Sequence, residues 1–351
     1  MQTEVIEINN IKRQQGDLDR AGEIIRTGGL VAFPTETVYG LGANGLDGNA
    51  CKKIYLAKGR PSDNPLILHV ANRAMIKDIA AEVTDLAEKL LAAFCPGPIT
   101  LILKHTALVP EQITGSLATV GVRMPESDVA RAFIKAAGVP VAAPSANISG
   151  RPSPTTAEAV LKDMQGRIPL ILDGGACHYG VESTIVDCTG EKAVILRPGA
   201  ITEEMLAEVA GEVEIDPALV GADAVPKAPG MKYKHYAPKA PLTLVEGEPQ
   251  KIAQGMRQQV EKWQEAGHKV GLIASMEVLK ELAGLVPEEL QADYGAQGDL
   301  PAIAADLYEA LRYFDDTDAD RLLAEGTTSE GLGLAIMNRL HKASGFHSLQ
   351  V

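Results

Sequence analysis

The stretch FPTETVYGLGANG, Phe33–Gly45, carries the spacing G-x-G-x-x-G from Gly40 to Gly45, which is typical of a dinucleotide-binding loop. In such a loop a strand runs straight into the first glycine and a helix opens at the last one. Here a proline and the polar run Thr35–Thr37 follow the apolar strand LVAF, and the next helical pattern begins only near Asn49. A tight turn that needs glycine for positive φ angles is therefore favoured over a dinucleotide site. That interpretation leaves the polar run without a role.

On both sides of this stretch, short apolar runs alternate with helical patterns, which is typical of α/β architecture. The predicted strands are LVAF, PLILHV, ITLILK, TVGVRM, VPVAA, PLILD, STIVDC and AVILR, and the predicted helices are DLDRAGEIIRT, NACKKIYLAK, TDLAEKLLAAF, DVARAFIKAAG, TTAEAVLKDM and TEEMLAEVAG. A second α/β pattern restarts with LTLVEG and includes the helix PQKIAQGMRQQVEKWQEAG and the strand KVGLIAS. We expect an α/β domain over residues 1–212, a linker over 213–241, and a smaller doubly wound α/β domain over 242–351.

Composition narrows the class of protein. The 351 residues favour two domains, and the net charge of −13 argues against a chain that coats nucleic acid nonspecifically. No apolar run approaches the roughly eighteen residues of a membrane span, and the N-terminal residues show no signal-peptide pattern. The four cysteines are scattered without a C-x-x-C pair, which predicts neither a zinc site nor a disulfide framework. We therefore expect a cytoplasmic protein that does not associate with membranes.

Polar side chains recur at the ends of the predicted strands, where α/β sheets build their binding crevices. AKGRPSDNPLILHV, Ala57–Val70, brings two cations, an asparagine and a histidine around a proline-held turn. APSANISGRPSPT, Ala143–Thr155, crowds hydroxyls and an amide into one loop, and VRMPES, GVESTIVD and LRPGAIT add arginines and hydroxyls. Two fixed cations beside a turn suit a polyphosphate, although a solvated helix end is the alternative for KGR alone.

This set of residues favours chemistry by positioning and charge neutralisation. The sequence shows no Ser-His-Asp order, no metal-ligand cluster and no lysine in a G-K-[ST] loop. Phosphoryl or nucleotidyl transfer therefore fits better than covalent catalysis.

Six segments resemble, in order and spacing, the motifs of the YrdC family: FPTETVYGLGAN, KGRPSDNPLILHV, TVGVRMP, APSANISGRPSPT, GVESTIVD and LRPGAIT. The resemblance covers about residues 10–210, and PGMKYKHYAP, Pro229–Pro238, is similar to the linker of the family's long form. It implies a twisted α/β sheet around a large, positively charged concave cavity, followed by a smaller Rossmann-like accessory domain. It also implies an enzyme that joins L-threonine, bicarbonate or CO2, and ATP into L-threonylcarbamoyl-AMP and releases pyrophosphate. A partner enzyme would transfer the threonylcarbamoyl group to an adenosine in tRNA.

The resemblance further implies roles for single residues. The threonine site would consist of Thr37, His69, Arg123, Ala143 and Ser183. ATP would be held by Arg60, Asn64, Thr119, Ser145, Ser153, Arg197, Tyr233 and Tyr236. Lys58 and Arg60 are the expected catalytic residues, as cations for the phosphates or the carbamate. Mg²⁺ would accompany the triphosphate with few or no protein carboxylates as ligands, and Glu36 is the acidic residue closest to this expectation.

The linker contains a basic segment, PKAPGMKYKHYAPK, with four lysines and no acid. We interpret it as a lid that folds over the triphosphate and shields the labile carbamate from water, with Lys232, Tyr233 and Tyr236 near the phosphates. A solvated tether is the alternative interpretation.

Three other functions compete with the synthase. An RNA-binding or RNA-maturation module is one, since the family was first associated with double-stranded RNA binding; it should lose affinity steeply with salt whether or not threonine is present. An NAD(P)-dependent enzyme would bind nicotinamide. A hydrogenase-maturation carbamoyl transferase shares the core motifs, but the zinc-finger and acylphosphatase segments of that larger protein are absent from this sequence.

Overall fold

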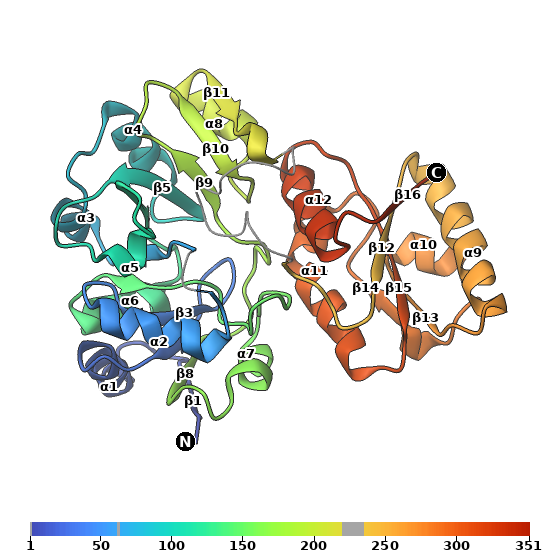
Figure 1. Cartoon of the computed structure of the whole chain (residues 1–351), viewed down its shortest axis with the longest axis horizontal. Helices are drawn as coiled ribbons and strands as arrows, with labels where there is room; N and C mark the ends of the chain where they lie inside the picture. The colour runs from blue at the N-terminus through green and yellow to red at the C-terminus, as the bar shows by residue number, and fades with distance from the viewer. Residues whose placement is uncertain (1, 62–63, 220–234) are drawn as a thin grey trace. The chain divides into compact units, whose positions relative to one another are not determined.

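The structure is a computed structural model that describes residues 2–61, 64–219 and 235–351. It divides into two compact units, each with its own sheet (Figure 1). The first unit holds the described residues up to Leu219, apart from Gly150–Pro152 and Tyr179–Val181, and the second holds these two segments and the described residues from His235 on.

A mixed 11-stranded sheet forms the first unit, in the order β1-β8-β2-β3-β7-β4-β6-β5-β9-β10-β11. Its strands are β1 (Glu4–Glu7), β2 (Val31–Phe33), β3 (Gly40–Asn44), β4 (Ile67–His69), β5 (Ile99–Lys104), β6 (Thr119–Arg123), β7 (Val141–Ala142), β8 (Leu170–Asp173), β9 (Thr184–Asp187), β10 (Ala193–Arg197) and β11 (Val213–Ile215). The last of these pairs in parallel with β10, so the sheet extends into the first residues of the predicted linker. Most of that linker, residues 220–234, lies outside the described part of the chain.

The helices in the described part of this unit are α1 (Gln15–Arg26), α2 (Gly48–Lys58), α3 (Arg73–Ile79), α4 (Asp85–Phe94), α5 (Glu111–Thr114), α6 (Asp128–Ala137), α7 (Ala157–Met164) and α8 (Glu203–Ala210), followed by the 3₁₀ turn η1 (Pro217–Leu219). Of these eight helices, six match predicted helices, whereas α3 and α5 were not predicted. The predicted N-cap of α4 is confirmed, since the Thr84 hydroxyl accepts the Ala87 N–H at 3.1 Å. Helix α1 packs closely on α6: a Cβ on Gly22 would lie 2.6 Å from the Ala136 backbone.

Two of the three glycines of the opening stretch, Gly40 and Gly42, belong to β3, which runs antiparallel to β2 and pairs Gly40 with Phe33. Gly45 follows the strand in a turn. None of them has a positive φ angle, so the expected reason for glycine was wrong. The actual reason is close packing: a Cβ on Gly42 would lie 2.8 Å from the Val141 side chain, and one on Gly45 would lie 2.5 Å from that of Leu68. The first two glycines lie inside a strand, and α2 begins at Gly48 rather than at the last glycine, so the arrangement differs from a strand–loop–helix dinucleotide site.

The second unit is a doubly wound α/β domain, as the sequence predicts. Its 5-stranded sheet has the order β14-β13-β15-β12-β16, and neighbouring strands run parallel. Its elements are β12 (Leu242–Glu246), α9 (Pro249–Glu265), β13 (Val270–Ala274), α10 (Met276–Glu281), η2 (Glu288–Leu290), β14 (Gln291–Asp293), α11 (Leu300–Tyr313), η3 (Phe314–Asp316), β15 (Arg321–Glu325), α12 (Leu332–Ala343) and β16 (Ser348–Gln350). Figure 1 shows α9 and α10 on one face of this sheet and α11 and α12 on the other.

Two expectations from composition can be compared with the structure. The four cysteines are free, and Cys51, Cys177 and Cys188 are buried, as expected for small apolar side chains. Among the described helices none combines the length and the apolar character that crossing a bilayer requires.

Candidate active site

A buried ion pair lies at the centre of the predicted threonine site. The Arg123 guanidinium donates through one terminal nitrogen to Glu36 Oε1 at 2.6 Å, and the two side chains are only 5% and 2% exposed. Strand register explains the neighbourhood, since β4 and β6 are parallel and pair His69 with Arg123. Glu36 comes from the loop between β2 and β3, the polar run that the sequence left without a role.

His69 is buried beside this pair as a neutral ring. Its ring packs edge-on against Phe33, with centroids 5.8 Å apart. Burial, and then the neighbouring charge of Arg123, lower the pKa of His69 to about 3. A neutral imidazole keeps one donor and one acceptor, so His69 can form hydrogen bonds with a polar substrate without adding charge to the site.

We expect the His69 ring to stay unprotonated from pH 8 down to about pH 4.5. The unfolded chain takes up a proton on this residue near pH 6.5, whereas the native state does not, so acidification below that pH lowers the free energy of unfolding. The measurement is an NMR titration of the imidazole resonances, with His69→Gln identifying the signal. A midpoint near 6.5 would contradict this environment.

Lys58, predicted to face the phosphates or the carbamate, holds a loop. Its Nζ donates to the carbonyl oxygens of Ser145 at 2.5 Å and Asn147 at 2.6 Å, and lies 3.3 Å from Asn147 Oδ1. The same loop lies along the β2–β3 segment, since the Ala146 N–H donates to the Tyr39 carbonyl at 2.8 Å. The cation at the end of α2 is thus buried rather than solvated, and it shapes the loop that carries the predicted ATP residue Ser145.

Three more predicted residues, Ser183, Arg197 and Ser153, make a second set of polar contacts. Ser183 Oγ lies 2.8 Å from Thr100 Oγ1, and the Arg197 guanidinium donates to the Ser183 carbonyl and hydroxyl at 3.0 and 3.1 Å. Ser153 donates to Glu182 Oε1 at 2.5 Å, and both side chains are buried. The structure therefore ties a predicted threonine residue to a predicted ATP residue.

Sequence reasoning did not select Thr100 or Glu182. Glu182 stands in the motif GVESTIVD beside a selected serine, so the motif itself was the available signal. Thr100 lies inside an apolar strand, where a single hydroxyl gives no pattern.

The remaining predicted residues of this unit have separate environments. Thr37 is fully buried, with its hydroxyl 2.9 Å from that of Thr35, and the Ala143 N–H donates to the Ile67 carbonyl at 3.0 Å. Arg60 lies 5.9 Å from the centre of the Tyr55 ring. The Asn64 amide is buried, and neither its nitrogen nor its oxygen has a hydrogen-bond partner among the described residues. Thr119 is half-buried at the start of β6.

The two predicted tyrosines lie outside the described part of the first unit. Tyr236 belongs to the second unit, where its ring stacks on Tyr308 with centroids 5.3 Å apart. Tyr233 and Lys232 lie outside the described residues, so the lid stays a prediction.

The described polar side chains of this site can bind anions and neutral polar groups. Among the described residues, no group of three or more His, Cys, Asp or Glu side chains could hold a metal ion. The buried carboxylate of Glu36 is bonded to Arg123 and that of Glu182 to Ser153. Glu36, the acidic residue expected closest to a metal, therefore serves an arginine in this structure.

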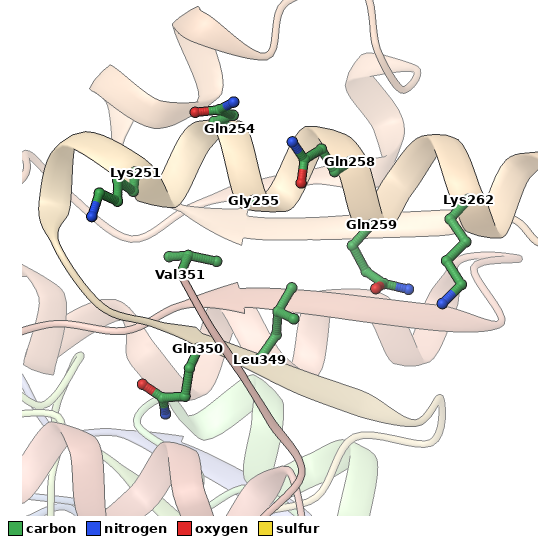
Figure 2. A pocket seen from close by; sticks show the side chains of 9 residues that line it. All are labelled: Lys251, Gln254, Gly255, Gln258, Gln259, Lys262, Leu349, Gln350 and Val351. Carbon is green, nitrogen blue, oxygen red and sulfur yellow. The ribbon is translucent and has the colours of Figure 1, made fainter.

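An open groove in the second unit has a different character. Figure 2 shows lysine and glutamine side chains of α9 facing the end of the chain at Val351. The groove has a volume of about 450 Å³ and is lined by Lys251, Gln254, Gly255, Gln258, Gln259, Lys262, Leu349, Gln350 and Val351. Val351 packs where Gly255 lacks a side chain, since a Cβ there would lie 2.3 Å from its Cγ1. The polar side chains that line this groove are amides and ammonium groups, so the groove resembles a solvated surface more than a reaction site.

Comparison with known proteins finds matches to both units of the chain. The Sua5/YciO/YrdC family model, described as "Telomere recombination", matches residues 23–199, and a model described as "Threonylcarbamoyl-AMP synthase, C-terminal domain" matches 201–345. The threonylcarbamoyl-AMP synthase of Pyrococcus abyssi is 48% identical over 94% of this chain and 95% of its own length, and that of Bacillus subtilis is 46% identical over 93% and 92%. The crystal structure of P. abyssi Sua5 complexed with L-threonine, 46% identical, superposes with a TM-score of 0.93 over 99% of this chain and 100% of its own.

Proposed function

This chain belongs to the Sua5/YciO/YrdC family, and we propose that it synthesises L-threonylcarbamoyl-AMP from L-threonine, bicarbonate or CO2, and ATP, releasing pyrophosphate. The structural observation that carries this function is the buried cluster of Arg123, Glu36 and His69, next to a loop shaped by Lys58. Near-full-length similarity to named synthases and to a threonine-bound structure supports the same reaction.

Threonine fits this cluster group by group. Arg123 supplies a charge-assisted hydrogen bond to the substrate carboxylate. The hydroxyls of Ser183 and Thr37 are buried in the first unit and can read the substrate hydroxyl, while neutral His69 adds no charge that would repel the ammonium group. The amine then condenses with bicarbonate to a carbamate, and a carbamate oxygen displaces pyrophosphate from the α-phosphorus of ATP.

We propose that ATP binds to the other polar residues predicted in this unit. Its contacts would be Arg60, Asn64, Thr119, Ser145, Ser153 and Arg197. Mg²⁺ enters with the triphosphate and is bound by phosphate oxygens and water, which suits an ion that keeps several waters. The residues of this chain contribute fixed cations and amides that stabilise charge developing on the leaving pyrophosphate.

The product points to a downstream partner. We propose that a transferase moves the threonylcarbamoyl group to tRNA, and direct RNA binding by this chain is the competing use of its polar surface. The deciding experiment is pyrophosphate release from ATP with threonine and bicarbonate present together or omitted singly. Release that needs both supports the synthase; release without threonine contradicts it, and tight, salt-sensitive RNA binding that threonine does not affect favours the RNA module.

We expect threonine to be the best amino acid substrate, serine poorer and valine poorest. Serine leaves a small apolar contact unmade, which is worth roughly 1–3 kcal/mol. Valine cannot form the hydrogen bond between the substrate hydroxyl and Ser183 or Thr37, and it places a methyl group against these buried hydroxyls, which costs about 1–3 kcal/mol. The measurement is kcat/KM for pyrophosphate release with each amino acid, and equal values for valine and threonine would refute this pocket.

A further inference from the structure

The buried carboxylate of Glu36 is an unexpected feature in a site for anions. ATP, bicarbonate and the threonine carboxylate are all negatively charged, and an unpaired buried acid would repel each of them. The family resemblance suggested Glu36 only as a neighbour of Mg²⁺, and the proposed reaction gives this side chain no task. Its contacts indicate one.

Glu36 is held at both carboxylate oxygens. Oε1 accepts from Arg123 at 2.6 Å, and Oε2 accepts the backbone N–H groups of Glu126 at 3.0 Å and Ser127 at 3.4 Å. Ser127 is the N-cap residue of α6, the helix that packs against α1. The carboxylate is therefore fixed by rigid backbone on one side and holds Arg123 on the other.

This contact leaves part of Arg123 unused. Its side chain is only 5% exposed, and its Nε is buried without a hydrogen-bond partner among the described residues. A buried N–H group without a partner is unfavourable, and a carboxylate is its strongest acceptor. The guanidinium is thus immobilised through one terminal nitrogen while another donor remains available to a ligand.

We propose that Glu36 is a positioning residue for threonine: it fixes the Arg123 guanidinium so that its remaining donors meet the substrate carboxylate. The inference rests on the proposed function, because it assigns the Arg123 ligand as threonine. Without the negative partner, Arg123 would keep its charge but gain rotational freedom, and the site would lose its selectivity for a carboxylate. ATP should be affected little, because its proposed contacts are other residues.

The test compares Glu36→Gln with Glu4→Gln. The control removes the carboxylate of another Glu–Arg pair, Glu4 with Arg20, in which both side chains are about half exposed. We expect Glu36→Gln to raise the threonine KM about 10- to 100-fold, as loss of a charge-assisted contact does, and to leave the ATP KM within about twofold. The control should leave both constants unchanged.

A second readout separates positioning from general damage to the fold. Dissociation constants for L-threonine and L-threoninamide, which lacks the carboxylate, are measured by calorimetry. Wild type should prefer threonine strongly, and Glu36→Gln should narrow that preference. Equal losses for both ligands, a matching rise in the ATP KM, or no change would overturn the proposal.

If Glu36→Gln does not fold, Glu36→Asp provides the same comparison, because it keeps the charge and shortens the reach to Arg123 by one methylene. It should narrow the preference for threonine over L-threoninamide, and an unchanged preference in a folded Asp variant would overturn the proposal. Failure of the synthase assignment is recognised separately, since wild type would then release no threonine-dependent pyrophosphate.

Discussion

Arg123→Ala is expected to lower kcat/KM for threonine in pyrophosphate release by about 10- to 100-fold or more. The change removes a charge-assisted contact to the substrate, typically worth about 1.5–3 kcal/mol, and leaves Glu36 as an uncompensated buried charge. Breaking a buried ion pair in this way costs about 3–5 kcal/mol of stability. Release rates across threonine concentrations, together with thermal unfolding, measure the two effects.

A double variant separates these effects. Replacing both members of the pair, Arg123→Met with Glu36→Leu, removes the stranded charge and should restore much of the lost stability. It should not restore threonine use, because the carboxylate partner is still missing. A threonine KM like that of wild type in Arg123→Ala would contradict the placement of the substrate carboxylate.

Lys58→Met is expected to lower the free energy of unfolding by roughly 3 kcal/mol and to impair ATP use strongly. Methionine fills similar space but cannot donate a hydrogen bond. The buried carbonyl groups of Ser145 and Asn147 would therefore lose their charged donor. The loop carrying Ser145 would then lose its shape, and the ATP KM should rise. Chemical denaturation and initial-rate kinetics provide the two measurements.

Lys53→Met is the matched control, since Lys53 lies on the same helix, is exposed, and also donates to a backbone carbonyl, that of Gly28 at 2.5 Å. Its stability should change little. A fully stable Lys58→Met variant that has lost catalysis would mean that Lys58 acts on the substrate directly rather than through the loop.

Local patterns predicted most of the architecture. Helices α4 and α6 have clear apolar periodicity and capping residues, and the strands of the second domain are short apolar runs, so their types could be read from sequence. Strand β3 could not, because a glycine-rich segment has weak strand propensity. It is a strand because it pairs with β2 and β7, and glycine is required at Gly40 and Gly42 because Phe33 and Val141 leave no room for a side chain.

The site was predictable by residue type but not by pairing. Motif residues indicated where the ligands bind, whereas the bond between Glu36 and Arg123 joins positions 87 residues apart, a distance that no spacing rule covers. The contacts of Lys58 could not be predicted from the sequence either. A lysine at a helix end is usually solvated, and only the folded loop shows that this one is buried.

The most direct test of the central claim is mass spectrometry of the product formed from ATP, L-threonine and ¹³C-labelled bicarbonate. We predict threonylcarbamoyl-AMP that carries the labelled carbon, formed together with pyrophosphate and missing when threonine is omitted. A product in which threonine is joined to AMP without the labelled carbon, or nucleotide hydrolysis with no threonine-containing product, would contradict it.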